Sequence, residues 1–276
     1  MVVPNLKSVI EKNRNLNRDF IRNLLKEELQ VYVLNFVYTS ARYKNLIFTG
    51  GTCLRKFYGL PRISEDLDFD IEEKVFNFGI FQNDLKNYFT ESLSYRDFDL
   101  KLKNETVFLR LPVLKEIGFS TQNETDILFL RVDFAFNKSR NFATEKQIFS
   151  GYDFSFLART YDFSTLVANK TAAFLTREYK KGGEQVESFK GRDAFDLVWM
   201  LGKLKKTGGS VNLKRIADLT GIKSKNELKK RIINKGNKIT EIDLFSDLKS
   251  FFADIDFVAD FSRNFTSLLE TNVRFL

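Results

Sequence analysis

The sequence predicts an α/β (α+β) protein in which a mixed sheet with flanking helices is followed by a helical C-terminal half. Up to residue 136, short apolar runs bounded by turn residues are interspersed with apolar residues at helical spacing. From about residue 164 onward, the apolar residues recur at helical spacing. We therefore expect two domains, residues 1–160 and 161–276, and 43% apolar residues are ample for their cores.

The N-terminal domain is expected to begin with helices within its first 45 residues. Leu6, Val9 and Ile10 form a short apolar face, and apolar residues between Phe20 and Phe36 form a longer one that we expect to pack against the sheet. Strands are predicted at 46–49, 67–71, 95–102, 106–114 and 127–136, with a helix near 78–89. The short polar turns between the last three strands favour an antiparallel arrangement.

The C-terminal domain is expected to contain helices at 166–179, 193–204, 213–219, 225–233, 242–252 and 257–269. Residues 201–240 contain twelve Lys or Arg but only two Asp or Glu, whereas the whole chain has a net charge of +8. Such a block is often a solvated helical surface. It would also attract a polyanion over a long range, and RNA is the partner we favour.

The composition excludes several classes of metal-binding and catalytic site. The only cysteine is Cys53, so the chain has no intramolecular disulfide or cysteine-cluster zinc site. It has no histidine, so any catalysis depends on carboxylates, lysines, arginines and hydroxyls. No apolar run approaches the length of a membrane-spanning helix, and the N-terminus lacks the pattern of a signal peptide. We expect a cytoplasmic protein without a membrane partner.

Two motifs lie close together between residues 45 and 70. Asp66 and Asp68 lie two residues apart on a predicted strand, so their carboxylates share one face and repel each other. A divalent cation relieves this repulsion, and oxygen ligands favour Mg²⁺ or Mn²⁺. Gly50 and Gly51 open a predicted helix whose backbone N–H groups suit a phosphate. Each motif alone has an ordinary explanation, as a solvated strand or a strand-to-helix turn.

The order of these motifs resembles the polymerase β type of nucleotidyltransferase fold. The segments Gly50-Gly-Thr-Cys-Leu-Arg55 and Arg62-Ile-Ser-Glu-Asp-Leu-Asp-Phe69 are similar to the AbiEii/AbiGii abortive-infection toxin family. A second block agrees, with Asn169-Lys-Thr-Ala-Ala-Phe-Leu-Thr-Arg177 followed by Gly191-Arg-Asp-Ala-Phe-Asp-Leu197. The resemblance spans roughly residues 45–200 and implies that residues 1–160 form a nucleotidyltransferase catalytic domain.

Nucleotidyl transfer by two metal ions needs a third carboxylate. Asp133 is the best candidate, because it is a lone acid on an apolar strand and matches the acid that follows the Asp-x-Asp strand in this fold. It could instead cap a loop or pair with Arg131 or Arg140. Asp70 continues the same strand face, but the family pattern requires only two acids, so we interpret Asp70 as solvated or supporting.

The resemblance also implies nucleotide-binding residues. Gly50, Gly51 and Thr52 would contact the β- and γ-phosphates. Arg62 and Ser64 match an element that lines the same pocket, although Arg62 could equally brace an acid. Lys170 is assigned to the triphosphate, and Arg177, two helical turns along, is a further phosphate contact.

Asp193 requires a comparison of two interpretations. Residue chemistry favours a structural role, because Asp193 suits a helix N-terminus and Arg192 with Asp196 forms an i, i+4 pair. The resemblance favours an active-site role, in which Asp193 orients Lys170 or helps to activate the acceptor hydroxyl. We predict the latter.

The resulting hypothesis is a toxin that transfers a nucleoside monophosphate from an NTP to RNA, with tRNA 3′ ends as the expected target. The family also implies a cognate antitoxin and a role in phage defence. Two alternatives are open on the sequence: nucleotidylation of a protein hydroxyl, and a non-catalytic module that binds RNA or a partner. The intact Asp66, Asp68 and Lys170 argue against the last.

Overall fold

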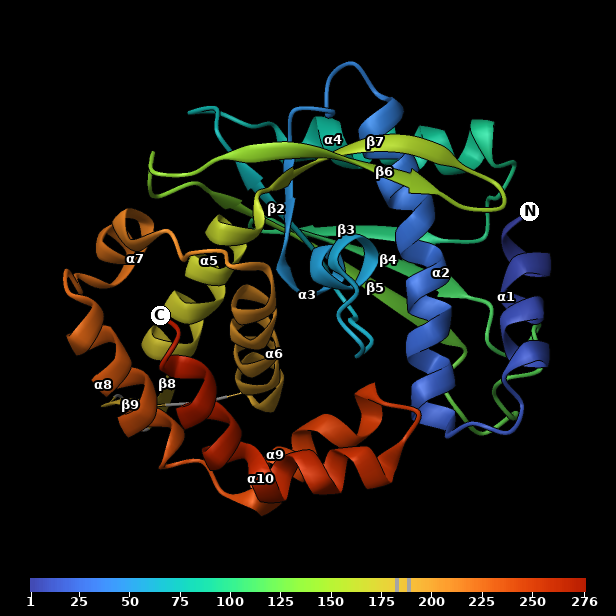
Figure 1. The fold of residues 1–276 in the computed structure, drawn as a ribbon. Helices are drawn as coiled ribbons and strands as arrows, with labels where there is room; N and C mark the ends of the chain where they lie inside the picture. The colour runs from blue at the N-terminus through green and yellow to red at the C-terminus, as the bar shows by residue number, and fades with distance from the viewer. Residues whose placement is uncertain (182–183, 188–189) are drawn as a thin grey trace. The chain divides into compact units, whose positions relative to one another are not determined.

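A computed structural model describes residues 1–181, 184–187 and 190–276 (Figure 1). The chain divides into two compact units. Unit 1 contains residues 1–137 and 145–160, and unit 2 contains residues 138–144 and 161–276. Among the described helices, none combines the length and hydrophobicity needed to cross a membrane.

Unit 1 is built on a seven-stranded mixed sheet with the order β3-β4-β5-β2-β1-β7-β6. Its strands are β1 (Ile47–Thr49), β2 (Leu67–Ile71), β3 (Asp99–Lys103), β4 (Thr106–Pro112), β5 (Ile127–Phe136), β6 (Thr144–Ser150) and β7 (Ser155–Tyr161). β2 is parallel to β5 and β1 is parallel to β7, whereas β1–β2, β3–β4 and β4–β5 are antiparallel. The mixed sheet and the antiparallel β3–β4–β5 segment confirm the prediction.

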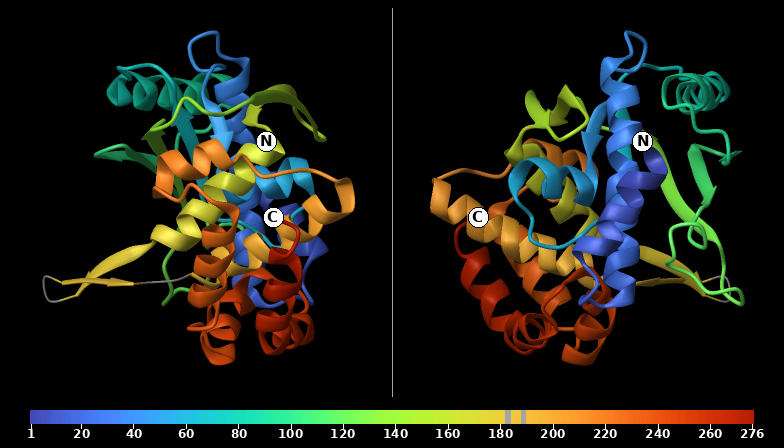
Figure 2. Two further views of the ribbon diagram at one scale, coloured as in Figure 1. Left: turned by 60° about the vertical axis from the view of Figure 1, so that its left-hand side comes forward. Right: turned by 90° about the vertical axis from the view of Figure 1, so that its right-hand side faces the viewer.

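The helices of unit 1 are α1 (Val2–Lys12), α2 (Arg18–Thr39), α3 (Gly50–Cys53) and α4 (Phe78–Asn87), with π-helical turns at Leu54–Tyr58 and Tyr88–Ser92. The Asn17 side chain caps α2 by accepting hydrogen bonds from the backbone N–H groups of Asp19 and Phe20. α1 packs along α2, as the views in Figure 2 show.

One face of the sheet is apolar and covered by helices. Phe69 on β2 stacks against Phe134 on β5, at 5.8 Å between ring centroids. Phe81 of α4 meets the Phe134 ring edge-on, and Tyr38 of α2 contacts Phe69. α2 and α4 therefore lie on the face of Phe69 and Phe134. Because side chains alternate along a strand, the neighbouring acids point to the opposite face.

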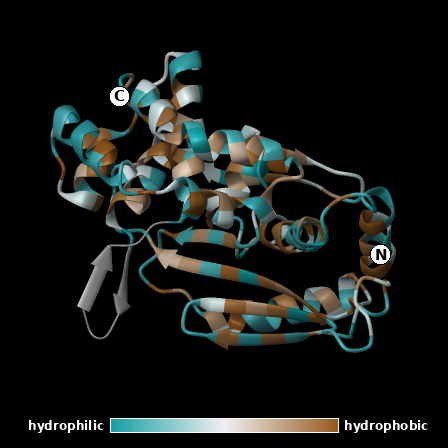
Figure 3. Cartoon of the chain, turned by 90° about the horizontal axis from the view of Figure 1, so that it is seen from below, coloured by the Kyte–Doolittle hydropathy of each residue, from teal (hydrophilic) through white to brown (hydrophobic). Residues whose placement is uncertain are grey.

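The predicted strands β2 and β5 alternate buried and more exposed residues in the structure. On β2, Leu67, Phe69 and Ile71 are buried while Asp68 and Asp70 are half-buried. Figure 3 shows the resulting change between apolar and polar residues along the strands. The limits predicted for these two strands, 67–71 and 127–136, agree with the structure.

Two predictions for the sheet were wrong. The third strand begins at residue 99 and not at 95, because Ser94 adopts a left-handed φ of +50° and Tyr95 N–H returns to the carbonyl of Phe89. The strands β6 and β7 were not predicted. β6 lies at the sheet edge and exposes Ile148, and β7 exposes Leu157 while burying Ala158, so neither has a clear apolar alternation.

Unit 2 is mainly helical, as predicted. Its helices are α5 (Phe163–Thr176), α6 (Gly191–Thr207), α7 (Leu213–Thr220), α8 (Lys225–Gly236), α9 (Glu241–Leu248), a 3₁₀ turn (Lys249–Phe251) and α10 (Ile255–Val273). A two-stranded ladder, β8 (Glu178–Lys181) and β9 (Glu184–Glu187), follows α5. The predicted helix 166–179 therefore ends too late, since Arg177 is already extended.

The core of unit 2 forms where α6, α9 and α10 pack together. The ring of Phe195 on α6 meets Phe252 and Phe261 edge-on, each at 4.9 Å between centroids. This packing fixes α6, and thereby the two acids Asp193 and Asp196 near its N-terminal end.

Candidate active site

The glycine turn and the acid pair form one structural element in unit 1. Gly50 follows β1 with a left-handed φ of +77°, which favours glycine. A Cβ added to Gly50 would lie 1.9 Å from Oδ2 of Asp68. A Cβ on Gly51 would lie 2.7 Å from both Arg62 Nη2 and Ser64 Oγ. The absence of two side chains therefore lets Asp68, Arg62 and Ser64 approach the turn.

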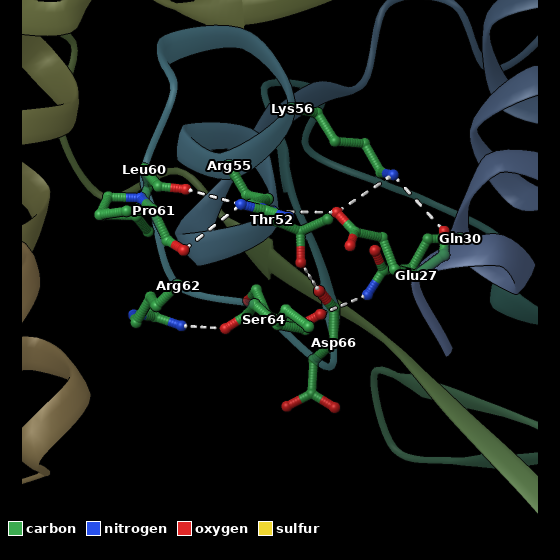
Figure 4. Close-up of polar contacts among 11 residues, drawn as sticks. Glu27, Gln30, Thr52, Arg55, Lys56, Leu60, Pro61, Arg62, Ser64 and Asp66 are labelled. Atoms are coloured by element: carbon green, nitrogen blue, oxygen red, sulfur yellow. Dashed lines mark hydrogen bonds and ion pairs between the residues drawn. The ribbon is translucent and has the colours of Figure 1, made fainter. Parts of the chain in front are cut away.

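The segment that leads into β2 is anchored on both sides. The buried Thr52 hydroxyl donates a hydrogen bond to the Asp66 carbonyl at 2.5 Å, and Gln30 Nε2 on α2 donates to the Ser64 carbonyl at 2.8 Å. Figure 4 shows these contacts, with the Asp66 carboxylate directed away from Thr52. Arg62 is 2% exposed and donates to the Ile63 carbonyl. The predicted residues of this segment thus lie in one ordered loop.

The turn that follows the glycines is tied to α2 by Glu27. Arg55 Nε lies 3.2 Å from Glu27 Oε1, and the Lys56 ammonium lies 3.8 Å from the same atom (Figure 4). Burial lowers the pKa of Lys56, and the carboxylate of Glu27 opposes that effect. Sequence reasoning missed this support, and the only signal was polar Glu27 and Gln30 within an apolar helix pattern.

Asp133 lies beside Asp68 across two parallel strands. The two residues are direct partners in the β2–β5 register, so their side chains share a face. One oxygen of Asp133 accepts from Thr106 Oγ1 at 2.6 Å, and the other accepts from Arg131 Nη2 at 2.5 Å. Asp133 therefore combines the two interpretations, since it adjoins the acid pair and also pairs with Arg131.

The carboxylates offer the oxygen ligands that Mg²⁺ and Mn²⁺ favour. Across residues 1–181, 184–187 and 190–276, no group of three or more Asp, Glu or Cys side chains is arranged to hold a metal ion. The donor chemistry and the register of Asp68 with Asp133 nevertheless fit a divalent ion.

Lys170, Arg177, Asp193 and Asp196 of unit 2 form a charged cluster around two buried acids. Lys170 Nζ lies 2.7 Å from Asp196 Oδ2 and 3.4 Å from Asp193 Oδ1. Arg177, just past the end of α5, places Nη2 2.8 Å from Asp193 Oδ2. The Asp196 side chain is fully buried and that of Asp193 is 7% exposed. Asp196 is thus nearer to Lys170 than Asp193 is. The sequence did not indicate this pairing.

The basic block of residues 201–240 has a mixed role in unit 2. Arg215 is 2% exposed and hydrogen bonds Asn169 and the Tyr161 hydroxyl. Lys235 is 5% exposed and donates to the carbonyls of Leu175 and Arg177. The exposed members are Lys205, Lys206, Lys214, Lys223, Lys225, Lys230, Arg231 and Lys238. Of the twelve cations, Arg215 and Lys235 are therefore buried and hydrogen bonded within unit 2. The positive charge of the remaining ten is largely exposed.

The chain is similar to one protein family and to several solved structures. The family model described as "Nucleotidyl transferase AbiEii toxin, Type IV TA system" matches residues 36–276. No curated protein matches the chain. JHP933 from Helicobacter pylori is 17% identical with a TM-score of 0.46, covering 91% of this chain and 93% of that one. A second H. pylori structure, provisionally described as a nucleotidyltransferase, gives the same identity and TM-score and covers 91% and 96%. An antigenic nucleotidyltransferase-like protein from Paracoccidioides brasiliensis is 14% identical, with a TM-score of 0.35 and coverage of 86% and 94%.

The matched range contains the glycine turn, the Asp-x-Asp strand, Lys170 and the Arg192-Asp193 motif. The family match extends over most of the chain, so the resemblance drawn from these motifs is confirmed. The chain belongs to the AbiEii family of nucleotidyl transferase toxins of type IV toxin–antitoxin systems.

Proposed function

We propose that this toxin transfers a nucleoside monophosphate from an NTP to an RNA acceptor, with the 3′ end of tRNA as the target. The observation that carries the proposal is the contact between the glycine turn and the acid pair, where Asp68 lies against Gly50. A phosphate-binding turn next to carboxylates is the arrangement that nucleotide chemistry requires.

Asp66 and Asp68, with Asp133 as the third ligand, would hold Mg²⁺ or Mn²⁺. The metal would neutralise phosphate charge and lower the pKa of the acceptor hydroxyl. Arg131 would have to release Asp133 for this purpose. The Arg131 side chain is 43% exposed and that of Asp133 is 24% exposed, so solvent weakens the pair.

Each unit contributes its own proposed nucleotide ligands. In unit 1, the backbone N–H groups of Gly50 and Gly51 would bind phosphate oxygens, with Arg62 and Ser64 beside them. The Thr52 backbone N–H would also bind phosphate, and the Thr52 hydroxyl would hold the turn in place through its hydrogen bond to the Asp66 carbonyl. In unit 2, Lys170 would contact the triphosphate, with Arg177 as a further phosphate ligand.

The acids around Lys170 would set its position. Asp196 and Asp193 hold the ammonium in the structure, at 2.7 and 3.4 Å. Asp193 would therefore orient Lys170, which is one of the two roles predicted for it. A compact ammonium held between two carboxylates has a fixed position, as a phosphate ligand needs.

The exposed lysines of the basic block supply a long-range attraction for RNA. A type IV toxin also implies an antitoxin, which we propose to be a separate protein of the same system.

The test is to incubate the purified protein with total RNA and each α-labelled NTP in turn, with Mg²⁺. We expect label in small RNA with wild type and none with Asp68→Asn. Asp70→Asn is the matched control, because Asp70 lies two residues along the same strand face and should keep transfer. Label that migrates with protein would contradict the RNA acceptor and show that the acceptor is a protein. An active Asp68→Asn variant would contradict the proposed site.

A further inference from the structure

We propose that the open face of β3–β4–β5 in unit 1 binds the last nucleotides of a single-stranded RNA acceptor and leads its 3′ end to Asp68 and Asp133. This inference rests on the proposed function and names the path of its substrate. The bases would stack on Phe108 and Phe129, and Lys101, Lys103 and Arg110 would contact the phosphates.

The strand register places these residues in successive rows on one face. The row of the acids runs from Asp68 through Asp133 and Thr106 to Lys103. The next row runs from Arg131 through Phe108 to Lys101, and the third runs from Phe129 through Arg110 to Asp99. Neighbouring rows are two residues apart, or about 6.8 Å along a strand. An extended single strand has nucleotides at a comparable spacing, so each row offers a place for one nucleotide.

This face is the one opposite α2 and α4. Along β4 and β5, Val107, Leu109, Leu130 and Val132 are buried beneath the sheet, whereas the alternate residues are half-buried or exposed. The helices of unit 1 that pack on Phe69 and Phe134 therefore leave the face of Phe108 and Phe129 without a helical cover of their own.

The two phenylalanines form an aromatic platform. Their rings are stacked at 5.5 Å between centroids with an interplanar angle of 25°, and Phe129 is 36% exposed. A groove of about 510 Å³ opens over them, and Lys101, Lys103 and Arg110 line it with no acidic residue. Aromatic rings between cations are how proteins hold single strands, because every base has a π-face and every linkage has a charge.

The cations of the groove are available to a phosphate at low cost. Lys101 and Lys103 are exposed. Arg110 lies 3.7 Å from Asp99, and the two side chains are 41% and 66% exposed, so solvent weakens that pair. A phosphate can replace Asp99 as the partner of Arg110 with a net gain of a charge-assisted hydrogen bond.

The chemistry favours an unpaired strand. In a duplex the bases are already stacked on each other and cannot lie on Phe108 or Phe129. Along β5, Arg131 lies in the row of Phe108, between the row of Phe129 and the row of Asp133, and it pairs with Asp133. When the 3′ hydroxyl of an RNA strand lies at the row of Asp68 and Asp133, the preceding nucleotide would lie over Phe108 and the one before it over Phe129.

The test measures binding of a 5′-fluorescein single-stranded RNA hexamer by anisotropy, without NTP or metal. We expect Phe129→Leu to weaken binding by about 5- to 140-fold, the range for removal of one base stack. Phe129→Trp should bind within about twofold of wild type, because it keeps an aromatic face. Tyr152→Leu is the matched control, since Tyr152 is a fully exposed aromatic residue elsewhere in unit 1 and should not matter.

The charge of the path is tested separately. Lys101→Gln with Lys103→Gln should reduce the slope of log affinity against log salt by about 0.7 for each phosphate that the protein no longer neutralises. A wild type that does not bind the hexamer, or a Phe129→Leu variant that binds as wild type does, would overturn the inference.

The outcomes also separate this inference from the proposed function. Label transfer to RNA with equal rates in wild type and Phe129→Leu would overturn the path and leave the transferase standing. Hexamer binding that depends on Phe129, without any transfer that depends on Asp68, would support the path and contradict the transferase. Equally weakened binding in Phe129→Leu and Tyr152→Leu would overturn the path, because the effect would not be local to this face.

Discussion

The carboxylate of Asp68 lies where the side chain of any residue other than glycine at position 50 would be, 1.9 Å from an added Cβ. The glycine turn and the acid therefore depend on each other, although Gly50 and Asp68 are 18 positions apart in the sequence. Gly50 also has the left-handed φ of +77°.

Gly50→Ala should abolish transfer, because the new Cβ displaces Asp68. Gly59→Ala is the matched control, since Gly59 has a similar φ of +79° with no atom within 4 Å of its added Cβ. Both variants should lose about 1–3 kcal/mol of unfolding free energy from backbone strain, measured by urea titration. Only Gly50→Ala should lose activity. Equal activities in the two variants would contradict a role in transfer for the close approach of Asp68 to Gly50.

Mg²⁺ should raise the unfolding temperature of the wild type. A ligand that binds only the folded state stabilises it, by about 2.7 kcal/mol at a hundredfold excess over Kd. Asp68→Asn should lose this response and Asp70→Asn should keep it, as read by differential scanning fluorimetry. Removal of the metal with EDTA should stop transfer. A Mg²⁺ response that persists in Asp68→Asn would place the ion elsewhere.

Lys170→Ala should impair both nucleotide use and stability. Its removal leaves the fully buried Asp196 without its ammonium partner, which costs about 3–5 kcal/mol. The double variant Lys170→Met with Asp196→Asn should recover stability, because no buried charge remains in that pair, but it should not recover transfer. Lys170→Arg should rescue transfer poorly, since a planar fork does not replace an ammonium.

The measurements for this cluster are chemical unfolding and the KM for NTP. A Lys170→Ala variant with unchanged stability and unchanged kinetics would contradict both roles. Recovery of transfer by the double variant would instead show that Lys170 serves only the fold.

Burial raises the pKa of the Cys53 thiol well above its usual value, and the charges of Glu145 and Asp68 add to the rise. Below the pKa of the unfolded thiol both states hold the proton, so this contribution is fully present. As the pH rises past about 9, the unfolded state loses the proton first and the folded state becomes less stable by up to about 1.4 kcal/mol per pH unit.

Urea unfolding between about pH 8 and pH 10 should therefore show a steeper loss of stability for wild type than for Cys53→Ala. The difference between the two proteins isolates Cys53 from the buried tyrosines, which titrate in both. Parallel pH profiles would contradict a buried, protonated thiol.

The substitutions Lys229→Gln, Lys230→Gln and Arg231→Gln should weaken RNA binding and reduce its salt dependence, with NTP affinity nearly unchanged. Lys249→Gln with Arg263→Gln is the control, because these exposed cations lie in the acidic C-terminal segment. RNA binding by filter retention at several salt concentrations gives the slope. If the triple variant has the wild-type slope, the basic block does not bind RNA and is only a solvated surface.

The sequence by itself determined the elements whose signal is local. The apolar runs at Leu67–Ile71 and Ile127–Phe136 predicted two strands, and both have the alternating burial of a strand with one covered face. The spacing of apolar residues likewise predicted the helices of unit 2. The glycine turn, the acid pair and the two helical motifs were sufficient for the family, since they depend on residue type and order.

Only the tertiary structure decided which distant residues meet. Asp133 was expected near the acid pair, and the structure shows how the two meet: it adjoins Asp68 because β2 and β5 are parallel neighbours, although β3 and β4 lie between them in the sequence. Arg215 and Lys235 looked like part of a charged surface and are buried, because carbonyls and hydroxyls from other elements accept their hydrogen bonds. The pairing of Lys170 with Asp196 also required α5 and α6 to pack. Such contacts depend on where strands and helices are placed in space, and a pattern along one chain carries no record of that placement.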